Sequence, residues 1–277
     1  MKVILLGWCR AASFYVRALL KSDARVVLVV TGDSAPAGGS LISMCQRAGV
    51  PVEFCSSANR PEFVLRLREL APDLILVAGW PELLRPPVRS VARIGTVNFH
   101  PSLLPDYRGK HPLFWAILRM EEEVGITVHH VTSAVDAGPI LLQRPLRVSP
   151  GSTSESLAED ADKLGASLIP ELLRMAEAGA LPHGSIPEQS GSYFPPARPE
   201  DGLLDWPRPA SELERLVRAC RGVIDAHTFF GGIKLVVHAA TVSPEVSQAA
   251  PGTVVDITDE GVRVACGQNL LFIRRWL

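Results

Sequence analysis

The first hundred residues alternate short apolar runs with segments of helical spacing, and this alternation restricts the fold more than any other feature of the chain. Runs of β-branched and leucine residues without polar alternation, bounded by Gly, Asp or Pro, are typical of buried parallel strands. They cover Val3–Leu6, Val26–Val30, Leu74–Val77 and Thr96–His100. Helices are expected at Ala11–Lys21, Ser40–Ala48 and Pro61–Leu70. This order predicts an α/β fold, a Rossmann-like, doubly wound and mostly parallel sheet whose ligands bind beyond the carboxyl ends of the strands.

The second half of the chain predicts a smaller β-rich domain after a linker. A short helix, a strand and a long helix interrupted near Pro170 are expected at Pro112–Met120, Gly125–Val131 and Ser154–Ala178, followed by a helix at Ala210–Cys220 and strands at Lys234–Val242 and Thr253–Val264. Residues 184–209 are rich in Ser, Pro and Gly, as linkers are. We therefore expect a catalytic domain over residues 1–183, a linker over 184–209 and an OB-like C-terminal domain over 210–277.

Composition and charge place this chain among ordinary globular proteins. Its 277 residues are 47% hydrophobic with a formal net charge of −1, so no global attraction to nucleic acid or to an anionic membrane is expected. The five cysteines are scattered without a CxxC pair, which favours reduced, structural thiols. No apolar run reaches the roughly 20 residues that span a bilayer, and Val3–Leu6 is too short for a signal-peptide core. These features predict a cytoplasmic protein that has no membrane partner.

Three side chains could together handle a proton and a developing oxyanion. Asn98 and His100 point to the same face at the end of a predicted strand, and Asp136 stands in an Asp-Ala-Gly-Pro turn. Imidazole exchanges protons near neutral pH, and a carboxamide N–H can donate to a tetrahedral oxyanion. Each residue also has a plain structural interpretation, as a strand-end histidine or a turn former. Separation in sequence leaves open whether the three side chains meet.

Dinucleotide and metal sites are not expected. Gly7-Trp8-Cys9-Arg10 follows the first predicted strand but lacks the G-x-G-x-x-G spacing that cradles a pyrophosphate. His129 and His130 are adjacent in a predicted strand, so they face opposite ways, and neither they nor His111 have an acidic partner at ligand spacing. We therefore expect neither NAD nor a metal ion.

Three motifs in this chain resemble the formyltransferase family that uses 10-formyltetrahydrofolate. They are Asn-x-His-Pro-Ser-Leu-Leu-Pro-x-Tyr-Arg-Gly from Asn98, Gly-Ile-Thr-Val-His from Gly125, and Asp-Ala-Gly-Pro-Ile from Asp136. The family includes methionyl-tRNA formyltransferase, glycinamide ribonucleotide transformylase and the sugar N-formyltransferases. Further along, Leu204-Asp205-Trp206 and its neighbours resemble the second domain of the formyltransferase that modifies UDP-4-amino-4-deoxy-L-arabinose. The resemblance covers nearly the whole chain and implies a one-carbon transferase.

The resemblance implies roles for particular residues. A primary amine would attack the formyl carbon, Asn98 and protonated His100 would hold the oxyanion, and Asp136 would stabilise the imidazolium and help to remove the amine proton. The implied folate pocket comprises Glu82, Leu83, Leu84, Lys110, Thr132, Ser133, Ala134, Val135 and Asp136. Lys110 stands where the arabinose-modifying enzyme has an arginine, and it keeps the charge but loses the bidentate fork.

The sequence favours a small-molecule amine as the acceptor, most plausibly on a nucleotide-linked aminosugar or a specialised-metabolite precursor. Thr31–Ser40 follows the second predicted strand without any Lys or Arg, whereas methionyl-tRNA formyltransferases usually carry a basic insertion there, so tRNA is not the expected partner. Three alternatives stay open: a methionyl-tRNA formyltransferase with a basic face around Arg10, Arg17 and Lys21, a 10-formyltetrahydrofolate hydrolase that releases formate, and a non-catalytic folate-binding protein. A homodimer is compatible with all of them.

Overall fold

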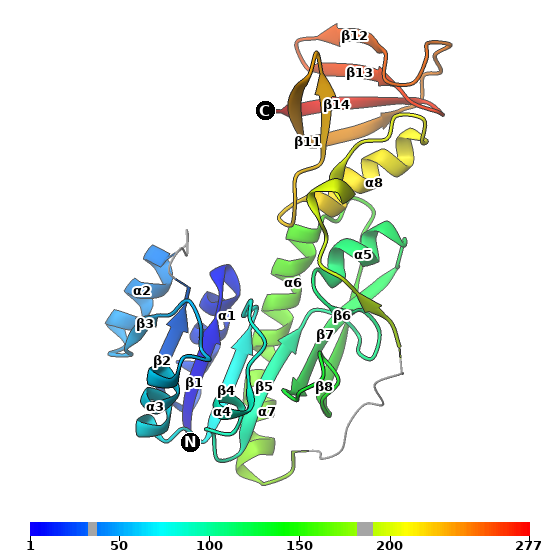
Figure 1. The fold of residues 1–277 in the computed structure, drawn as a ribbon. Helices are drawn as coiled ribbons and strands as arrows, with labels where there is room; N and C mark the ends of the chain where they lie inside the picture. Colours follow the sequence, from blue (N-terminus) through cyan, green and yellow to red (C-terminus); the bar gives the residue numbers. More distant parts are fainter. Residues whose placement is uncertain (33–37, 182–190) are drawn as a thin grey trace. The chain divides into compact units, whose positions relative to one another are not determined.

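The computed structural model describes residues 1–277 apart from 33–37 and 182–190 (Figure 1). The chain divides into two compact units that alternate along the sequence. The first comprises Met1–Gly109, Glu123–Arg147 and Glu159–Tyr193, and the second Lys110–Glu122, Val148–Ala158 and Phe194–Leu277. The sequence-based boundaries at residues 183 and 209 stay a prediction, and the start of the expected linker, 184–190, lies outside the described residues.

A seven-stranded, mostly parallel sheet forms the first unit, as the sequence predicts. Its strands lie in the order β3-β2-β1-β4-β5-β7-β8. Their bounds are β1 Lys2–Gly7, β2 Arg25–Thr31, β3 Val52–Phe54, β4 Leu74–Ala78, β5 Gly95–His100, β7 Glu123–His130 and β8 Ile140–Arg147. The first five strands are parallel, while β7 runs antiparallel to β5 and β8 antiparallel to β7. Since the strand order reverses at β1 and β4, the expected ligand crevice lies at their carboxyl ends.

Helices cover both faces of this sheet because its central strands are apolar on both sides. Their bounds are α1 Cys9–Leu19, α2 Gly38–Arg47, α3 Pro61–Leu70, α4 Pro86–Arg89, α6 Ser154–Ser167 and α7 Ile169–Glu177. Along β1, Val3 and Leu5 belong to the core cluster that contains Tyr15 of α1, while Ile4 belongs to the cluster that contains Phe63 of α3. Because side chains alternate along a strand, residues of β1 pack into the cores on both faces of the sheet. The predicted break of the long helix is confirmed, with Pro170 in the first turn of α7.

Several strands were not predicted, among them β3 and β8, and one was predicted wrongly. β3 has three residues and β8 carries a proline and charged residues, so neither shows the pattern of a buried strand. The expected single strand at Thr253–Val264 is a hairpin, β12 Val254–Thr258 and β13 Gly261–Ala265. Gly261, the first residue of β13, has a φ of 158° and no room for a side chain, because its Cβ would lie 2.2 Å from the carbonyl oxygen of Ile273.

The second unit combines helices with an antiparallel sheet of order β10-β11-β14-β13-β12, as its predicted β-rich class requires. Its other elements are α5 Pro112–Leu118, α8 Ala210–Cys220, β10 His227–Phe230, β11 Ile233–Ser243 and β14 Leu270–Trp276. A separate two-stranded ladder pairs β6 Arg108–Gly109 with β9 Tyr193–Phe194, at points where the chain passes from the first unit to the second. Four cysteines, Cys45, Cys55, Cys220 and Cys266, are free and buried. Among the described helices, none is both long and apolar enough to cross a bilayer.

One half-buried carboxyl group on α6, that of Asp162, interacts with Arg10 of α1. Burial raises the pKa of Asp162 to about 7, although Arg10 opposes the shift. Its charge adds to the effect of burial in raising the pKa of the Tyr15 hydroxyl, and that hydroxyl also fills the space against Gly165. The folded protein therefore holds this carboxyl group in its protonated form at a pH where an unfolded aspartate is ionised.

We expect Asp162→Asn to stabilise the protein at pH 8 and to leave its stability nearly unchanged at pH 4. Because the folded pKa is raised, the wild-type carboxyl contributes most stability below pH about 4 and loses it as the pH rises through about 7. The gain at pH 8 is at most about 4 kcal/mol in the free energy of unfolding. Urea titrations at both pH values measure it, with the exposed Asp160→Asn as control. A gain that is equal at both pH values would contradict the assignment.

Candidate active site

The predicted catalytic residues lie at the carboxyl end of β5. Asn98 and His100 alternate with Phe99 of the core, so both side chains leave the same face of the strand. The antiparallel neighbour β7 pairs Asn98 with His129 and His100 with Thr127. This pairing brings a second histidine to the site, beside the first.

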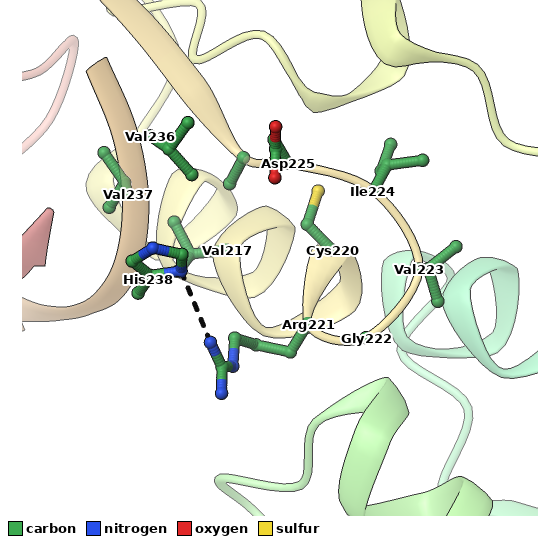
Figure 2. A pocket seen from close by; sticks show the side chains of 11 residues that line it. Val217, Cys220, Arg221, Gly222, Val223, Ile224, Asp225, Val236, Val237 and His238 are labelled. Atoms are coloured by element: carbon green, nitrogen blue, oxygen red, sulfur yellow. Dashed lines mark hydrogen bonds between the residues drawn. The ribbon is translucent and has the colours of Figure 1, made fainter. Parts of the chain in front are cut away.

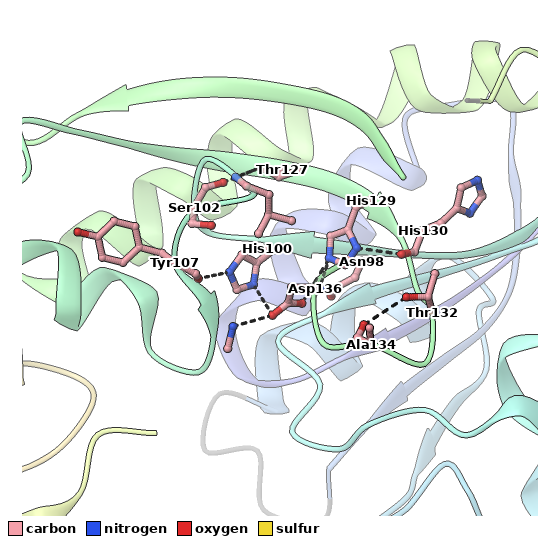
Figure 3. A network of polar contacts seen from close by, with 12 residues as sticks. Asn98, His100, Ser102, Tyr107, Thr127, His129, His130, Thr132, Ala134 and Asp136 are labelled. Carbon is pink, nitrogen blue, oxygen red and sulfur yellow. Dashed lines mark hydrogen bonds and ion pairs between the residues drawn. The ribbon is translucent and has the colours of Figure 1, made fainter. Parts of the chain in front are cut away.

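His100 is buried, with 5% of its surface exposed, and acceptors face both of its ring nitrogens (Figure 3). Nε2 lies 2.8 Å from the carbonyl oxygen of Tyr107, and Nδ1 lies 3.6 Å from Oδ2 of Asp136. A neutral imidazole has one N–H, so only the protonated ring can donate to both acceptors. The position of His100 therefore suits an imidazolium.

The loop that carries the Tyr107 carbonyl is fixed by hydroxyl groups of the Pro-Ser-Leu-Leu-Pro motif and its surroundings. The buried Ser102 donates through Oγ to the carbonyl of Asp106 at 2.8 Å and accepts through its own carbonyl from Thr127 Oγ1 at 2.6 Å. Tyr107 N donates to Ser192 Oγ at 3.0 Å. Ser102 and Thr127 thus hold the partner of His100, a role that their sequence positions alone did not indicate.

Asp136 occupies a left-handed backbone conformation, with φ of 49°, that turns its carboxylate toward β5. Oδ2 accepts a hydrogen bond of 2.9 Å from the Gly109 N–H, and Oδ1 lies 3.4 Å from His129 Nε2. The turn depends on Gly138, because a Cβ there would lie 1.8 Å from the carbonyl oxygen of His130. The Asp-Ala-Gly-Pro motif therefore brings a carboxylate to two histidines, and Asn98, His100 and Asp136 form one network.

His129 has a larger part in this network than its place in the sequence predicts. It is 2% exposed, and its Nε2 lies 3.2 Å from Asn98 Nδ2, while Nδ1 lies 2.9 Å from the carbonyl oxygen of His130. A proton on Nδ1 can donate to that carbonyl, while Nε2 faces both the Asn98 amide and the Asp136 carboxylate. His129 thereby orients the NH2 group of Asn98. The antiparallel pairing of β5 with β7 was the missing information.

The surroundings of the network affect the pKa values of Asp136 and His100 in different ways. Burial raises the pKa of Asp136, but His100, His129 and the Gly109 N–H outweigh this effect and hold it well below its usual range. The pKa of His100 lies below its usual value because burial lowers it, and Asp136 and the Tyr107 carbonyl offset that shift in part. Asp136 is therefore ionised at neutral pH, and it is the group that favours a proton on His100.

The segments expected to bind folate flank this network from two strands. After β4, the Glu82 carboxylate is held by Ser57 Oγ at 2.7 Å and by Ala58 N at 3.0 Å, and Asn59 Nδ2 donates to the Leu83 carbonyl at 2.9 Å. Leu83 is 67% exposed and Leu84 is buried. Within the described residues, the Leu84 N–H and the Glu82 carbonyl have no hydrogen-bond partner. A fixed loop thus presents open backbone groups.

The other predicted folate residues follow β7 and β6. Thr132 donates through Oγ1 to the Ala134 carbonyl at 3.2 Å, which shapes the turn that contains Ser133 and Val135 and leads to Asp136 (Figure 3). Lys110 is exposed and begins a segment of the second unit. No group of three His, Cys, Asp or Glu residues in the described part of the chain has metal-binding geometry.

Comparisons with known proteins identify the family. Residues 1–173 match the family described as formyl transferase, and residues 197–276 match the formyl transferase C-terminal domain. A methionyl-tRNA formyltransferase of Roseiflexus castenholzii is 35% identical over 99% of this chain and 90% of its own length, and that of Desulfotalea psychrophila is 32% identical over 99% and 87%.

A solved structure with a similar fold is HypX from Aquifex aeolicus in complex with tetrahydrofolic acid. It has a TM-score of 0.72 and 20% identity over 99% of this chain, which spans 43% of that protein. The fold and both family matches agree with the motifs around Asn98 and Asp136. The chain belongs to the formyl transferase family, and the enzyme class predicted from its sequence, a 10-formyltetrahydrofolate-dependent formyltransferase, is confirmed.

Proposed function

We propose that this enzyme transfers the formyl group of 10-formyltetrahydrofolate to the α-amino group of methionyl-tRNA. We infer the identity of the acceptor from sequence similarity. Two methionyl-tRNA formyltransferases align with 99% of this chain, at 32% and 35% identity. The small-molecule acceptor favoured by the sequence has less support than this alternative. The absence of Lys and Arg after β2 was a weak argument, and residues 33–37 of that segment lie outside the described residues.

The network at β5 supports the chemistry of acyl transfer. The amine attacks the formyl carbon, a C–N bond forms, and the oxyanion accepts hydrogen bonds from the Asn98 amide and from protonated His100. The bond to N10 of the folate then breaks, and N10 gains a proton from His100, which acts as the acid. The proton that the amine loses passes through water to the Asp136 carboxylate, whose low pKa keeps it ionised, and returns to His100. The net result is a formamide and tetrahydrofolate.

We assign folate binding to the loop after β4 and the turn after β7. The open N–H of Leu84 and carbonyl of Glu82 can read the polar edge of a pterin, and Leu84 offers an apolar side chain next to them. Glu82 itself is held by Ser57 and Ala58, so its role is to fix the loop rather than to contact the ligand. Thr132 to Asp136 would close the opposite side, and Lys110 would meet an anionic part of the folate.

A small-molecule amine is the second candidate, and the charge of the second unit favours it. This unit has eleven Lys and Arg residues against thirteen Asp and Glu. Several of its cations are paired, including Arg218 with Glu214 at 2.8 Å and Arg221 with Glu155 at 3.1 Å. Neutralisation of tRNA phosphates requires cations that are available to the phosphates.

A cavity of about 260 Å³ beside α8 illustrates this point (Figure 2). Arg221 lies on its wall with Nη1 3.4 Å from His238 Nδ1, and Asp225 contributes a carboxylate to the same lining. Because Glu155 already binds Arg221, the cavity offers a phosphate little net positive charge. By contrast, Arg274 and Arg275 on β14 are exposed, and we expect them to be available to tRNA phosphates.

The deciding experiment is an acceptor competition at physiological ionic strength. We expect the purified enzyme with 10-formyltetrahydrofolate to add one formyl group to methionyl-tRNA, detected by mass, faster than to UDP- or TDP-aminosugars or to hydroxyornithine. Transfer to a small amine alone would establish the second candidate. Formate release that is independent of any acceptor would instead establish a hydrolase, and failure to bind a folate would overturn both transferase proposals.

A further inference from the structure

Two tryptophans follow the two strands at which the sheet reverses its order. Trp8 comes directly after β1, and Trp80 comes two residues after the end of β4. The connections from β1 and β4 lead to opposite ends of the sheet order, so a crevice opens beyond their carboxyl ends. Ligands of doubly wound sheets bind in this crevice, and both indole rings are only half-buried there.

The two rings form a fixed aromatic wall. Their centroids are 5.8 Å apart with an interplanar angle of 82°, which is a favourable edge-to-face contact. Trp8 N donates to the Ala78 carbonyl at 3.0 Å, and the Trp8 ring covers Gly32 after β2 so closely that a Cβ there would lie 1.8 Å from a ring carbon. The wall therefore spans the ends of β2, β1 and β4, and its geometry depends on the missing side chain at Gly32.

The strand register places this wall next to the catalytic network. Gly7 of β1 pairs with Ala78 of β4, and Ala78 pairs with Phe99 of β5. Trp8 and His100 each follow one residue later, so two strand spacings separate their backbones, about 10 Å in total. An acceptor whose amine approaches His100 would therefore have its nearest substituents within reach of the Trp8 ring.

The two tryptophans lead into different segments. Trp80 continues into the loop assigned to folate, Glu82 to Leu84, which Ser57 and Ala58 hold in place. Trp8 lies directly before α1, and we therefore assign the Trp80 side of the wall to the donor and the Trp8 side to the acceptor. Trp8 occupies the position after the first strand where dinucleotide-binding proteins have glycines that cradle phosphate. An indole offers apolar area and favourable contact to a thioether, and no charge or backbone cradle for a phosphate.

We propose that Trp8 is a specificity-determining residue that forms the wall of the acceptor subsite and recognises an apolar, thioether-bearing side chain next to the reactive amine. The inference rests on the proposed formyl transfer to a methionyl group and assigns the recognition of that group to a single ring. Trp80 supports the ring of Trp8 from the donor side, and Gly32 gives it room.

The test measures binding without catalysis. Its probes are two stable amides that mimic the aminoacyl end of tRNA, 3′-methionylamino-3′-deoxyadenosine and its alanyl counterpart, titrated calorimetrically into the full-length enzyme saturated with tetrahydrofolate. We expect the wild type to bind the methionyl amide about 10-fold more tightly than the alanyl amide, since three further apolar groups are buried. Trp8→Ala should reduce this ratio to about 2-fold or less, whereas Trp8→Phe should keep most of it.

Two further variants separate recognition from folding. Gly32→Ala leaves Trp8 in the chain but displaces its ring, so it should also reduce the ratio. Trp276→Ala, at an exposed tryptophan of the second unit, should leave the ratio unchanged. Each variant must bind tetrahydrofolate as the wild type does, which shows that the first unit is folded.

The outcomes distinguish the subsite from the proposed function. A wild type that does not prefer the methionyl amide, or a folded Trp8→Ala that keeps the preference, overturns the inference, even if methionyl-tRNA is formylated. A preference that depends on Trp8 in an enzyme that does not formylate methionyl-tRNA supports the subsite and overturns the proposed function. Loss of the ratio in Trp8→Ala and Gly32→Ala, with formylation by the wild type, supports both.

Discussion

Replacement of His100 by asparagine is expected to lower kcat about 1,000-fold while the affinity for tetrahydrofolate changes less than about 3-fold. The imidazolium supplies both a hydrogen bond to the oxyanion and the proton for the leaving N10, and each such contribution is worth roughly 100-fold or more. Asparagine is smaller than histidine, and its amide nitrogen takes the place of Nδ1, from which it can donate to the Asp136 carboxylate that lies 3.6 Å from His100 Nδ1. The fold should therefore survive, and the loss should appear in the chemical step. Single-turnover formylation measures it directly.

The matched control for this prediction is His130→Asn. His130 follows His129 on β7, but its side chain points away from Asp136 (Figure 3). We expect this variant to keep kcat within about 3-fold, since it touches neither the oxyanion nor the leaving group. Equal losses in both variants would show that the activity depends on the packing of β7 rather than on the acid at His100. A His100→Asn enzyme with wild-type kcat would remove His100 from the mechanism.

The fold was predictable wherever a local pattern decides it. Val3–Leu6 and its parallel neighbours are apolar on both faces, and such runs occur where helices cover both sides of a sheet. Pro61–Leu70 has a first-turn proline, and its predicted bounds coincide with those of α3. β8 was missed because its Arg144, Pro145 and Arg147 are acceptable only on an outer strand of the sheet, and only tertiary structure shows that it is one.

The site was predictable to the extent that its residues lie in one strand or one motif. Asn98 and His100 share a face by strand geometry, so their pairing follows from the sequence. Asp136 reaches them through a left-handed turn and an antiparallel strand, and no local pattern fixes that path. The resemblance to formyltransferases supplied the association instead. Neither strand geometry nor the family resemblance predicted the role of His129, because that role arises from the register between β5 and β7.

Replacement of Asp136 by asparagine is expected to lower kcat about 100- to 1,000-fold and to move the alkaline limb of the pH profile to lower pH. Asparagine tolerates the left-handed backbone at this position, with φ of 49°, and its oxygen can still accept from the Gly109 N–H. The variant thus removes the charge and keeps the turn. Its effect isolates the electrostatic contribution of Asp136 to His100.

The direction of the pH shift follows from the pKa of His100. Burial lowers this pKa, and Asp136 opposes the shift, so loss of the carboxylate should lower the pKa further. The acid form of His100 disappears as the pH rises through its pKa, and in Asp136→Asn this loss must begin at a lower pH, by roughly one unit for an opposite charge at this distance. The acidic limb, set by the acceptor amine, should stay in place in both enzymes. Profiles of kcat/KM from pH 5 to 9 test this, and an alkaline limb that does not move would show that Asp136 does not control the protonation of His100.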